Sequence, residues 1–158
     1  MIKISFEALV DTARLIVTEE MPYPLATVWV AQTEGLYVQK WWAPTDYENT
    51  EVDITTAVGG TWRVTQRDPE GNQYSFYGKV ERAEPQALLE FTLTSEIYPD
   101  SVLHITQDFA ARDGGTVVAT TYEFANLDAL NTYLALGGTE RLSQASARLD
   151  ALLTQLTE

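Results

Sequence analysis

The chain has 158 residues, 45% of them hydrophobic and 21% charged, a composition typical of one soluble globular domain with its own core. Ten lysines and arginines against 23 aspartates and glutamates give a formal net charge of −13, which disfavours binding to nucleic acids and to anionic membranes. The absence of cysteine excludes disulfides, thiolate metal sites and cysteine nucleophiles, and with no signal-peptide pattern we expect a cytoplasmic protein.

The first residues alternate between apolar and polar side chains, the apolar ones being Ile2, Ile4 and Phe6. This period of two predicts an extra strand within residues 1–12, added to a sheet edge of this chain or of a second copy. A second strand is expected at 14–18, where β-branched residues are frequent. The two prolines in 21–24 end it, because proline cannot donate a ladder hydrogen bond.

Two short helices are predicted after this strand. Leu25, Val28 and Trp29 follow the helical period, and a second helix opens near Leu36. The sequence Trp41-Trp42-Ala43-Pro44 closes the pair.

From about residue 48 to 124 the pattern predicts an antiparallel meander of strands. Apolar and polar side chains alternate, as in the run that contains Trp62 and Val64 and the run that contains Tyr74 and Phe76. Turn-forming residues separate the runs, for example at 68–72, 98–100 and 113–115.

The last segment is predicted to be a long helix with a single apolar stripe, formed by Leu142, Ala145, Leu149, Leu152, Leu153 and Leu156. Asn126 or Asp128 is expected to cap the helical region. Each of the adjacent glycines Gly137 and Gly138 would cost about 1 kcal/mol inside a helix, so the helix either begins after them or is kinked there. The expected fold class is α+β, with a curved antiparallel sheet wrapped around the C-terminal helix.

Several motifs occur in a characteristic order: Val28-Trp29, Trp41-Trp42-Ala43-Pro44, Asp53, Gly59-Gly60-Thr61-Trp62-Arg63, Asp68-Pro69-Glu70-Gly71, Gly78, Glu84-Pro85 and Gly114-Gly115-Thr116. In this order the chain resembles, over about residues 13–156, the heat-shock-protein-90 ATPase activator homologue (AHSA-like) family of the START-like, SRPBCC helix-grip superfamily. The resemblance implies a cavity between sheet and helix, and it implies no single chemistry, because members bind lipids, cyclise polyketides or dock on a chaperone. Two positions depart from the family pattern. No arginine follows Asp53 within 54–57, and Thr139 stands where a tryptophan is usual, so the size of the cavity is not carried over.

The candidate ligand-binding residues are those expected to converge on the concave face of the sheet: Trp42, Trp62, Val64, Tyr74, Phe76, Phe91, Tyr122 and Leu134. Together they offer wide apolar walls with two phenol hydroxyls, as in a small-molecule pocket. The small residues Gly78, Gly137 and Gly138 are expected to leave room. We therefore expect a hydrophobic or aromatic small molecule as the ligand, with a filled core as the alternative.

No catalytic residue, metal site or cofactor site is expected. His104 is the only histidine, and alternation places it opposite Leu103 and Ile105, towards solvent. No nucleophile elbow, dinucleotide fingerprint or phosphate loop occurs.

Two further functions stay open. One is a protein-interaction module, such as a regulator of the chaperone heat-shock protein 90, and a homodimer is a related hypothesis. The other is an enzyme that acts on an aromatic or polyketide-like compound, with Tyr74, Tyr122 or His104 as its proton shuttle.

Overall fold

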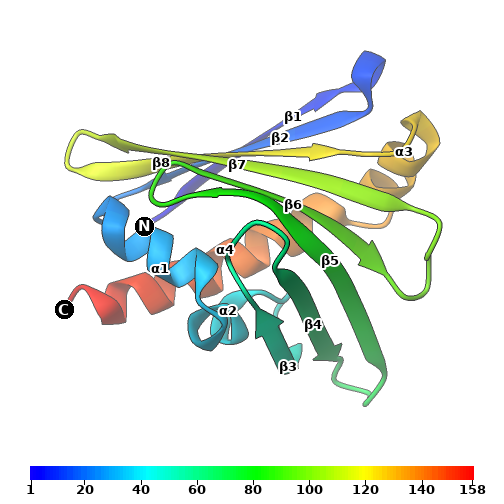
Figure 1. Cartoon of the computed structure of the whole chain (residues 1–158), viewed down its shortest axis with the longest axis horizontal. Coiled ribbons are helices and arrows are strands. Elements are labelled where there is room, and N and C mark those ends of the chain that lie inside the picture. The colour runs from blue at the N-terminus through cyan, green and yellow to red at the C-terminus, as the bar shows by residue number, and fades with distance from the viewer.

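The computed structural model describes residues 1–158 and contains one eight-stranded antiparallel sheet, in the order β1-β2-β8-β7-β6-β5-β4-β3 (Figure 1). The strands are β1 (Lys3–Leu9), β2 (Arg14–Met21), β3 (Glu48–Ile54), β4 (Thr61–Arg67), β5 (Gln73–Glu84), β6 (Leu88–Ser95), β7 (Val102–Arg112) and β8 (Gly115–Glu123). A single turn of 3-10 helix, η1 (Val10–Thr12), joins β1 to β2.

Four α-helices accompany the sheet: α1 (Leu25–Thr33), α2 (Gly35–Trp41), α3 (Leu127–Ala135) and α4 (Gly138–Leu156). The long helix α4 crosses one face of the curved sheet, and α1 and α2 lie beside it (Figure 1). Helix α4 turns a stripe that includes Leu149, Leu152 and Leu153 towards the sheet, and these three leucines are buried. The α+β fold predicted from the sequence is confirmed, including the two short helices after the β2 strand.

The two helices at the C-terminal end are separated at the glycine pair. Gly137 has a φ of +80°, a left-handed conformation that glycine adopts without strain, and α4 begins at Gly138. Helix α3 begins after Asn126, whose side-chain oxygen accepts a hydrogen bond from the Ala129 amide at 2.9 Å. A new helix therefore starts at the glycine pair, and of the two predicted caps Asn126 is the one used.

The N-terminal strand lies on the sheet of this same chain. It pairs with β2 from Lys3 opposite Glu20 to Leu9 opposite Arg14, which makes β1 one edge of the sheet. The backbone amide of Ile2 also donates to Asp150 Oδ1 of α4 at 3.1 Å. The N-terminus is thus tied to both the sheet and the long helix.

Two glycines that were expected to leave room for a ligand have a different role. A Cβ atom at Gly78 would collide with the backbone carbonyl of Thr92 on the neighbouring strand, and a Cβ atom at Gly138 would collide with the Tyr133 ring. Neither glycine lines the cavity described below. The expectation was therefore wrong for both, since each permits close packing of the chain on itself.

Candidate functional site

A cavity of about 820 Å³ lies between the concave face of the sheet and helix α4. Of its 35 lining residues, 23 are hydrophobic, and they come from both halves of the sheet, from α3 and α4, and from the segment after α2. Its volume lies in the range of ligand pockets for small molecules.

The half of the cavity beside β4, β5 and β6 has aromatic walls. The rings of Trp62 and Phe91 are stacked with centroids 4.4 Å apart, and Trp42 packs edge-on against Trp62 at 6.2 Å and against Phe76 at 5.6 Å. Alternation along the strands sends these side chains to the concave face, and the chain after α2 brings Trp42 to meet them. Such ring pairs are rigid and present flat apolar surfaces.

Tyr74 lies at the outer edge of this aromatic half, where its ring stacks on Tyr47 with centroids 6.2 Å apart. Its hydroxyl donates to Asp68 Oδ2 at 3.0 Å, and this hydrogen bond raises the pKa of Tyr74. Asp68 Oδ1 also accepts hydrogen bonds from the backbone amides of Glu70 and Asn72, which fix the Asp68 side chain within the turn at 68–72. The Tyr74 phenol is therefore engaged in holding the turn at 68–72.

The other half of the cavity, beside β2, β8 and β7, carries polar side chains. Gln107 Nε2 donates to Gln32 Oε1 at 3.0 Å and to Thr120 Oγ1 at 3.4 Å. Gln32 is only 2% exposed, and its Nε2 has no hydrogen-bond partner. A buried donor without a partner is costly, and the aromatic half holds one as well, Trp62 Nε1.

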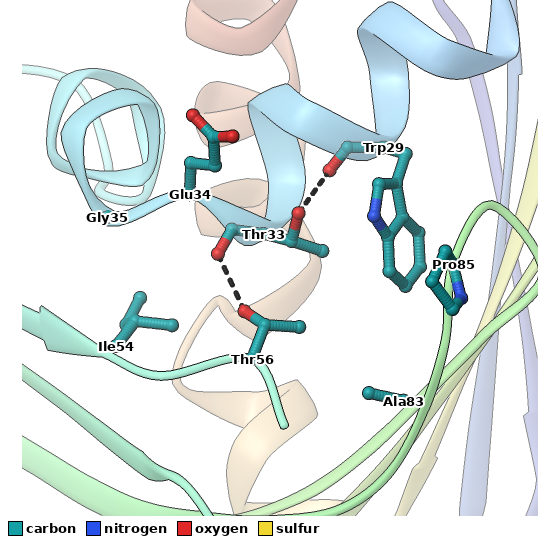
Figure 2. A pocket seen from close by; sticks show the side chains of 8 residues that line it. All are labelled: Trp29, Thr33, Glu34, Gly35, Ile54, Thr56, Ala83 and Pro85. Carbon is teal, nitrogen blue, oxygen red and sulfur yellow. Dashed lines mark hydrogen bonds between the residues drawn. The ribbon is translucent and has the colours of Figure 1, made fainter. Parts of the chain in front are cut away.

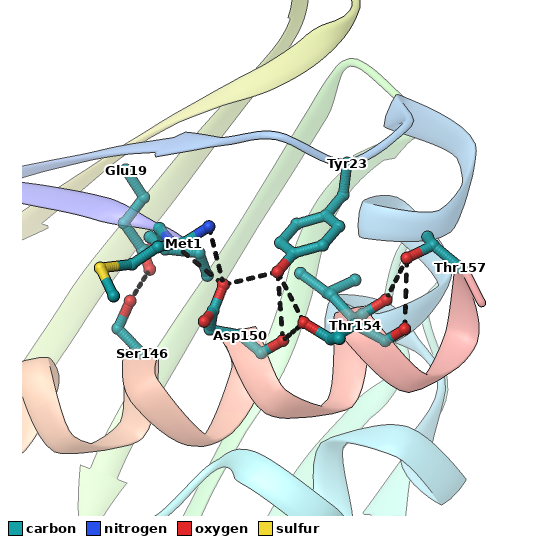
Figure 3. Close-up of polar contacts among 9 residues, drawn as sticks. Met1, Glu19, Tyr23, Ser146, Asp150, Thr154 and Thr157 are labelled. Carbon is teal, nitrogen blue, oxygen red and sulfur yellow. Dashed lines mark hydrogen bonds and ion pairs between the residues drawn. The ribbon is translucent and has the colours of Figure 1, made fainter.

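Glu19 is the one carboxylate deep in this polar half. Strand β2 turns Leu15, Val17 and Glu19 to the same concave face, and Ser146 Oγ on α4 donates to Glu19 Oε2 at 2.7 Å (Figure 3). Burial raises the pKa of Glu19, and the Ser146 hydrogen bond opposes that rise only in part. Glu19 forms no ion pair.

Tyr122 of β8 lines the same half, and its hydroxyl makes no hydrogen bond within the protein. Burial raises the pKa of Tyr122 well above its usual value, and the neighbouring Tyr133 and Glu19 add to the effect. At neutral pH this phenol is a neutral donor that faces the cavity.

The cavity opens between the β6–β7 loop and the turn that joins α3 to α4. Ile97, Tyr98 and Leu136 line this mouth, and each is more than 60% exposed. Arg141 is the only basic residue of the lining, and its Nη1 donates to the Leu136 carbonyl oxygen at 2.5 Å. Its guanidinium also lies over the Tyr133 ring, 5.7 Å from the centroid.

One arginine of α4 fixes the wall formed by residues 41–47. Arg148 Nη1 donates to the carbonyl oxygens of Pro44 and Tyr47 at 2.9 Å each and to that of Ala43 at 3.3 Å, while Nη2 donates to Lys40 at 3.2 Å. A guanidinium suits this role because it has five donors in a rigid plane. The wall that carries Trp42 is thereby attached to the long helix.

Six of the eight residues predicted for the site line this cavity: Trp42, Trp62, Tyr74, Phe76, Phe91 and Tyr122. Val64 and Leu134 do not line it. Val64 is completely buried in the main core, and Leu134 packs in a smaller cluster with Leu15, Val17 and Leu130.

Sequence reasoning missed Glu19, Ser146, Gln107 and Arg148. A signal for Glu19 was present, because it lies two residues after Val17 and two before Met21, on the face that those apolar residues bury. Ser146 and Arg148 gave no such signal, because their partners are more than 100 residues away in the chain.

The three residues considered as proton shuttles have different surroundings. His104 lies on the outer face, half exposed, with its Nδ1 3.6 Å from Glu81 Oε1. Tyr74 is bound to Asp68, so only Tyr122 presents a free hydroxyl to the cavity. No group of three or more histidine or carboxylate side chains is placed to hold a metal ion.

A second, smaller pocket of about 390 Å³ lies at the junction of α1 and α2 (Figure 2). Three of its eight lining residues are hydrophobic. Thr56 Oγ1 donates to the Thr33 carbonyl at 2.7 Å and Thr33 Oγ1 to the Trp29 carbonyl at 2.6 Å, so its polar groups tie the chain after β3 to α1. It is less suited to an apolar ligand than the cavity under the sheet.

Fold and cavity together define a protein of the helix-grip class, and comparison with known proteins identifies the family. The family described as "Activator of Hsp90 ATPase homolog 1-like protein" matches residues 22–154, and the chain belongs to it. No curated protein matches the chain. None of the helices combines the length and the apolar composition that a membrane span requires.

Solved structures of bacterial proteins share the fold. A Rhodobacter sphaeroides protein is 22% identical over 98% of this chain and 99% of its own, with a TM-score of 0.88. A Mycobacterium smegmatis protein is 25% identical over 96% of this chain and 97% of its own, with a TM-score of 0.85. The AHSA1 protein of Silicibacter pomeroyi is 18% identical over 90% and 98%, with a TM-score of 0.75.

Proposed function

We propose that this protein binds a hydrophobic or aromatic small molecule in the cavity between the sheet and α4. The observation that carries the proposal is the cavity itself, about 820 Å³ in volume with 23 hydrophobic residues among its 35 lining residues. A cavity of this size and apolar lining, open at one end, is suited to hold a ligand. The Trp42, Trp62 and Phe91 rings supply a rigid surface for it.

The test is a titration with N-phenyl-1-naphthylamine, a neutral apolar dye whose fluorescence rises in apolar surroundings. Ala145 lines the cavity from α4, so Ala145→Phe fills part of its space. Ala147 is exposed on the same helix, and Ala147→Phe is the matched control. We expect saturable binding to the wild type and to the control, and binding about tenfold weaker in Ala145→Phe.

Two results would contradict the proposal. One is the absence of any saturable signal with the wild-type protein. The other is an Ala145→Phe variant that folds and binds the dye as the wild type does, because the dye would then lie outside the cavity.

The second candidate function is docking on heat-shock protein 90, which the description of the matched family names. Docking is favoured by the exposed apolar side chains at the mouth of the cavity, where Ile97 and Tyr98 are each more than 60% exposed. Titration of purified heat-shock protein 90 would test it, with the double substitution I97S/Y98S expected to weaken the complex. Failure of the wild type to bind would remove this candidate and leave the first untouched.

A further inference from the structure

The lining of the cavity is divided along the sheet. The polar side chains Glu19, Thr120 and Gln107 come from the adjacent strands β2, β8 and β7, whereas the apolar rings of Trp62 and Phe91 come from β4 and β6. Because these strands lie in this order across the sheet, the three polar side chains gather on one side of the cavity, among apolar residues such as Val17 and Ile105, and the aromatic rings lie on the other side. A ligand that fits both halves is amphipathic.

Glu19 dominates the polar half because it is an acidic group without a charged partner. Its neighbours in the adjacent strands are apolar, Ile4 on one side and Val118 on the other. Its only hydrogen bond comes from the neutral hydroxyl of Ser146. Glu19 contributes to the raised pKa of Tyr122, after burial and Tyr133, and Tyr122 is a neutral phenol at pH 7.

No basic side chain of the protein compensates this carboxylate. Arg141 is the only basic residue of the cavity lining, and it is engaged with the Leu136 carbonyl and the Tyr133 ring at the mouth. The nearby N-terminal ammonium of Met1 lies 3.8 Å from Asp150, a different carboxylate (Figure 3). A buried carboxylate without a cation is unfavourable, and a cation that enters with the ligand removes the penalty.

We propose, on the basis of the ligand-binding function above, that Glu19 and Ser146 form a recognition site for a protonated amine. The ligand of this cavity is then an amphipathic amine, with its ammonium group at Glu19 and its apolar part against the aromatic rings of β4 to β6. Ser146 donates to one carboxylate oxygen, Oε2, and thereby leaves Oε1 to accept from the ammonium group. The net charge of −13 draws a cation, and not an anion, towards the protein.

The sheet also sets the length of the ligand. Glu19 on β2 and Phe91 on β6 are separated by β8 and β7, which makes three strand spacings or about 14 Å across the strands. The register also places them four residues or about 13 Å apart along the strands, so the two positions are about 19 Å apart on the sheet. An extended ten-carbon chain covers about two thirds of this distance and so reaches from Glu19 towards the aromatic half. Decylamine and 1-decanol are therefore a suitable pair of probes, because they have the same chain and differ only in the charge of the end group at neutral pH.

The experiment is calorimetric titration of both probes at pH 7.5 into three proteins: the wild type, Glu19→Gln and Glu20→Gln. Glu20 is the next residue on β2 and lies exposed, so the control removes the same charge from the other side of the strand. We expect decylamine to bind the wild type and Glu20→Gln about tenfold more tightly than 1-decanol does. In Glu19→Gln this preference is lost.

Each other outcome overturns the inference in a recognisable way. If both probes bind the wild type equally, the cavity takes apolar ligands but Glu19 does not select an amine, and only this inference fails. If Glu20→Gln loses the preference as fully as Glu19→Gln does, the effect is general attraction to an acidic protein. If neither probe binds the wild type and the naphthylamine dye also fails, the proposed function falls as well.

Discussion

Substitution of Arg148 tests whether its hydrogen bonds to the segment 40–47 stabilise the wall of the cavity. Its guanidinium donates to four backbone carbonyls of the segment 40–47, two of them at 2.9 Å. Arg148→Met keeps a similar apolar stem and removes all four hydrogen bonds. The carbonyl oxygens that stay buried then lose their hydrogen-bond donor, and this loss lowers the free energy of unfolding.

The expected magnitude follows from the two short bonds, to Pro44 and Tyr47. A hydrogen bond from a charged group contributes about 1.5 kcal/mol at the low end of its range, so the pair gives about 3 kcal/mol. The longer bond to Ala43 is discounted because Nη1 has two hydrogens for three acceptors, and the bond to Lys40 is discounted because it is exposed and water replaces it readily. For a protein of this size, 3 kcal/mol corresponds to a fall in Tm of about 6–12 °C.

The assay is urea unfolding followed by tryptophan fluorescence, with Arg141→Met as the control. Arg141 lies on the same helix but donates to a single carbonyl, so its loss should cost less than about 1 kcal/mol. Because residues 41–47 carry Trp42, Arg148→Met should also weaken dye binding. A free energy of unfolding for Arg148→Met within about 0.5 kcal/mol of the wild type would refute the reasoning.

Three further predictions concern single side chains. Burial raises the folded-state pKa of Glu19 above its ordinary value of 4.5. Between these two pKa values the folded protein binds more protons than the unfolded chain does. The free energy of unfolding therefore falls as the pH rises towards the folded-state pKa. Glu19→Gln should therefore unfold at higher urea than the wild type at pH 8 and at about the same urea at pH 4; a constant difference across this range would contradict the assignment. Asn126→Ala should cost about 1 kcal/mol by removing the cap of α3, whereas Asn131→Ala, in the same helix, should change the free energy of unfolding by less than about 0.5 kcal/mol. Gly78→Ala should cost more than about 2 kcal/mol in thermal or urea unfolding, because its Cβ meets the Thr92 carbonyl, and a wild-type Tm for this variant would show that the strands can separate there.

Much of the fold could be predicted because its signals are local. The period of two along Ile2, Ile4 and Phe6 indicated the edge strand that the structure places beside β2. The leucine stripe of 142–156 indicated the helix that crosses the sheet. The family motifs then added the helix-grip arrangement, and the match to residues 22–154 confirmed the family.

A residue of the candidate site was predictable only where the face of the sheet to which its side chain points decides whether it lines the cavity. Alternation sends Trp62 and Phe91 to the concave side, and both line the cavity. The same rule sends Val64 to that side, yet other side chains cover it completely. Alternation specifies a direction, but the depth at which helices pack over the sheet decides which inward side chains reach an open space.

The sequence by itself therefore determined the strands, the helices and the face that each side chain takes, because these depend on neighbours a few residues apart. Only the tertiary structure decided that a cavity stays open, that Ser146 meets Glu19 and that Arg148 meets the segment 40–47. Those contacts join residues more than 100 positions apart, and they exist only once the sheet has curved around α4. No local period in the sequence encodes a contact of that kind.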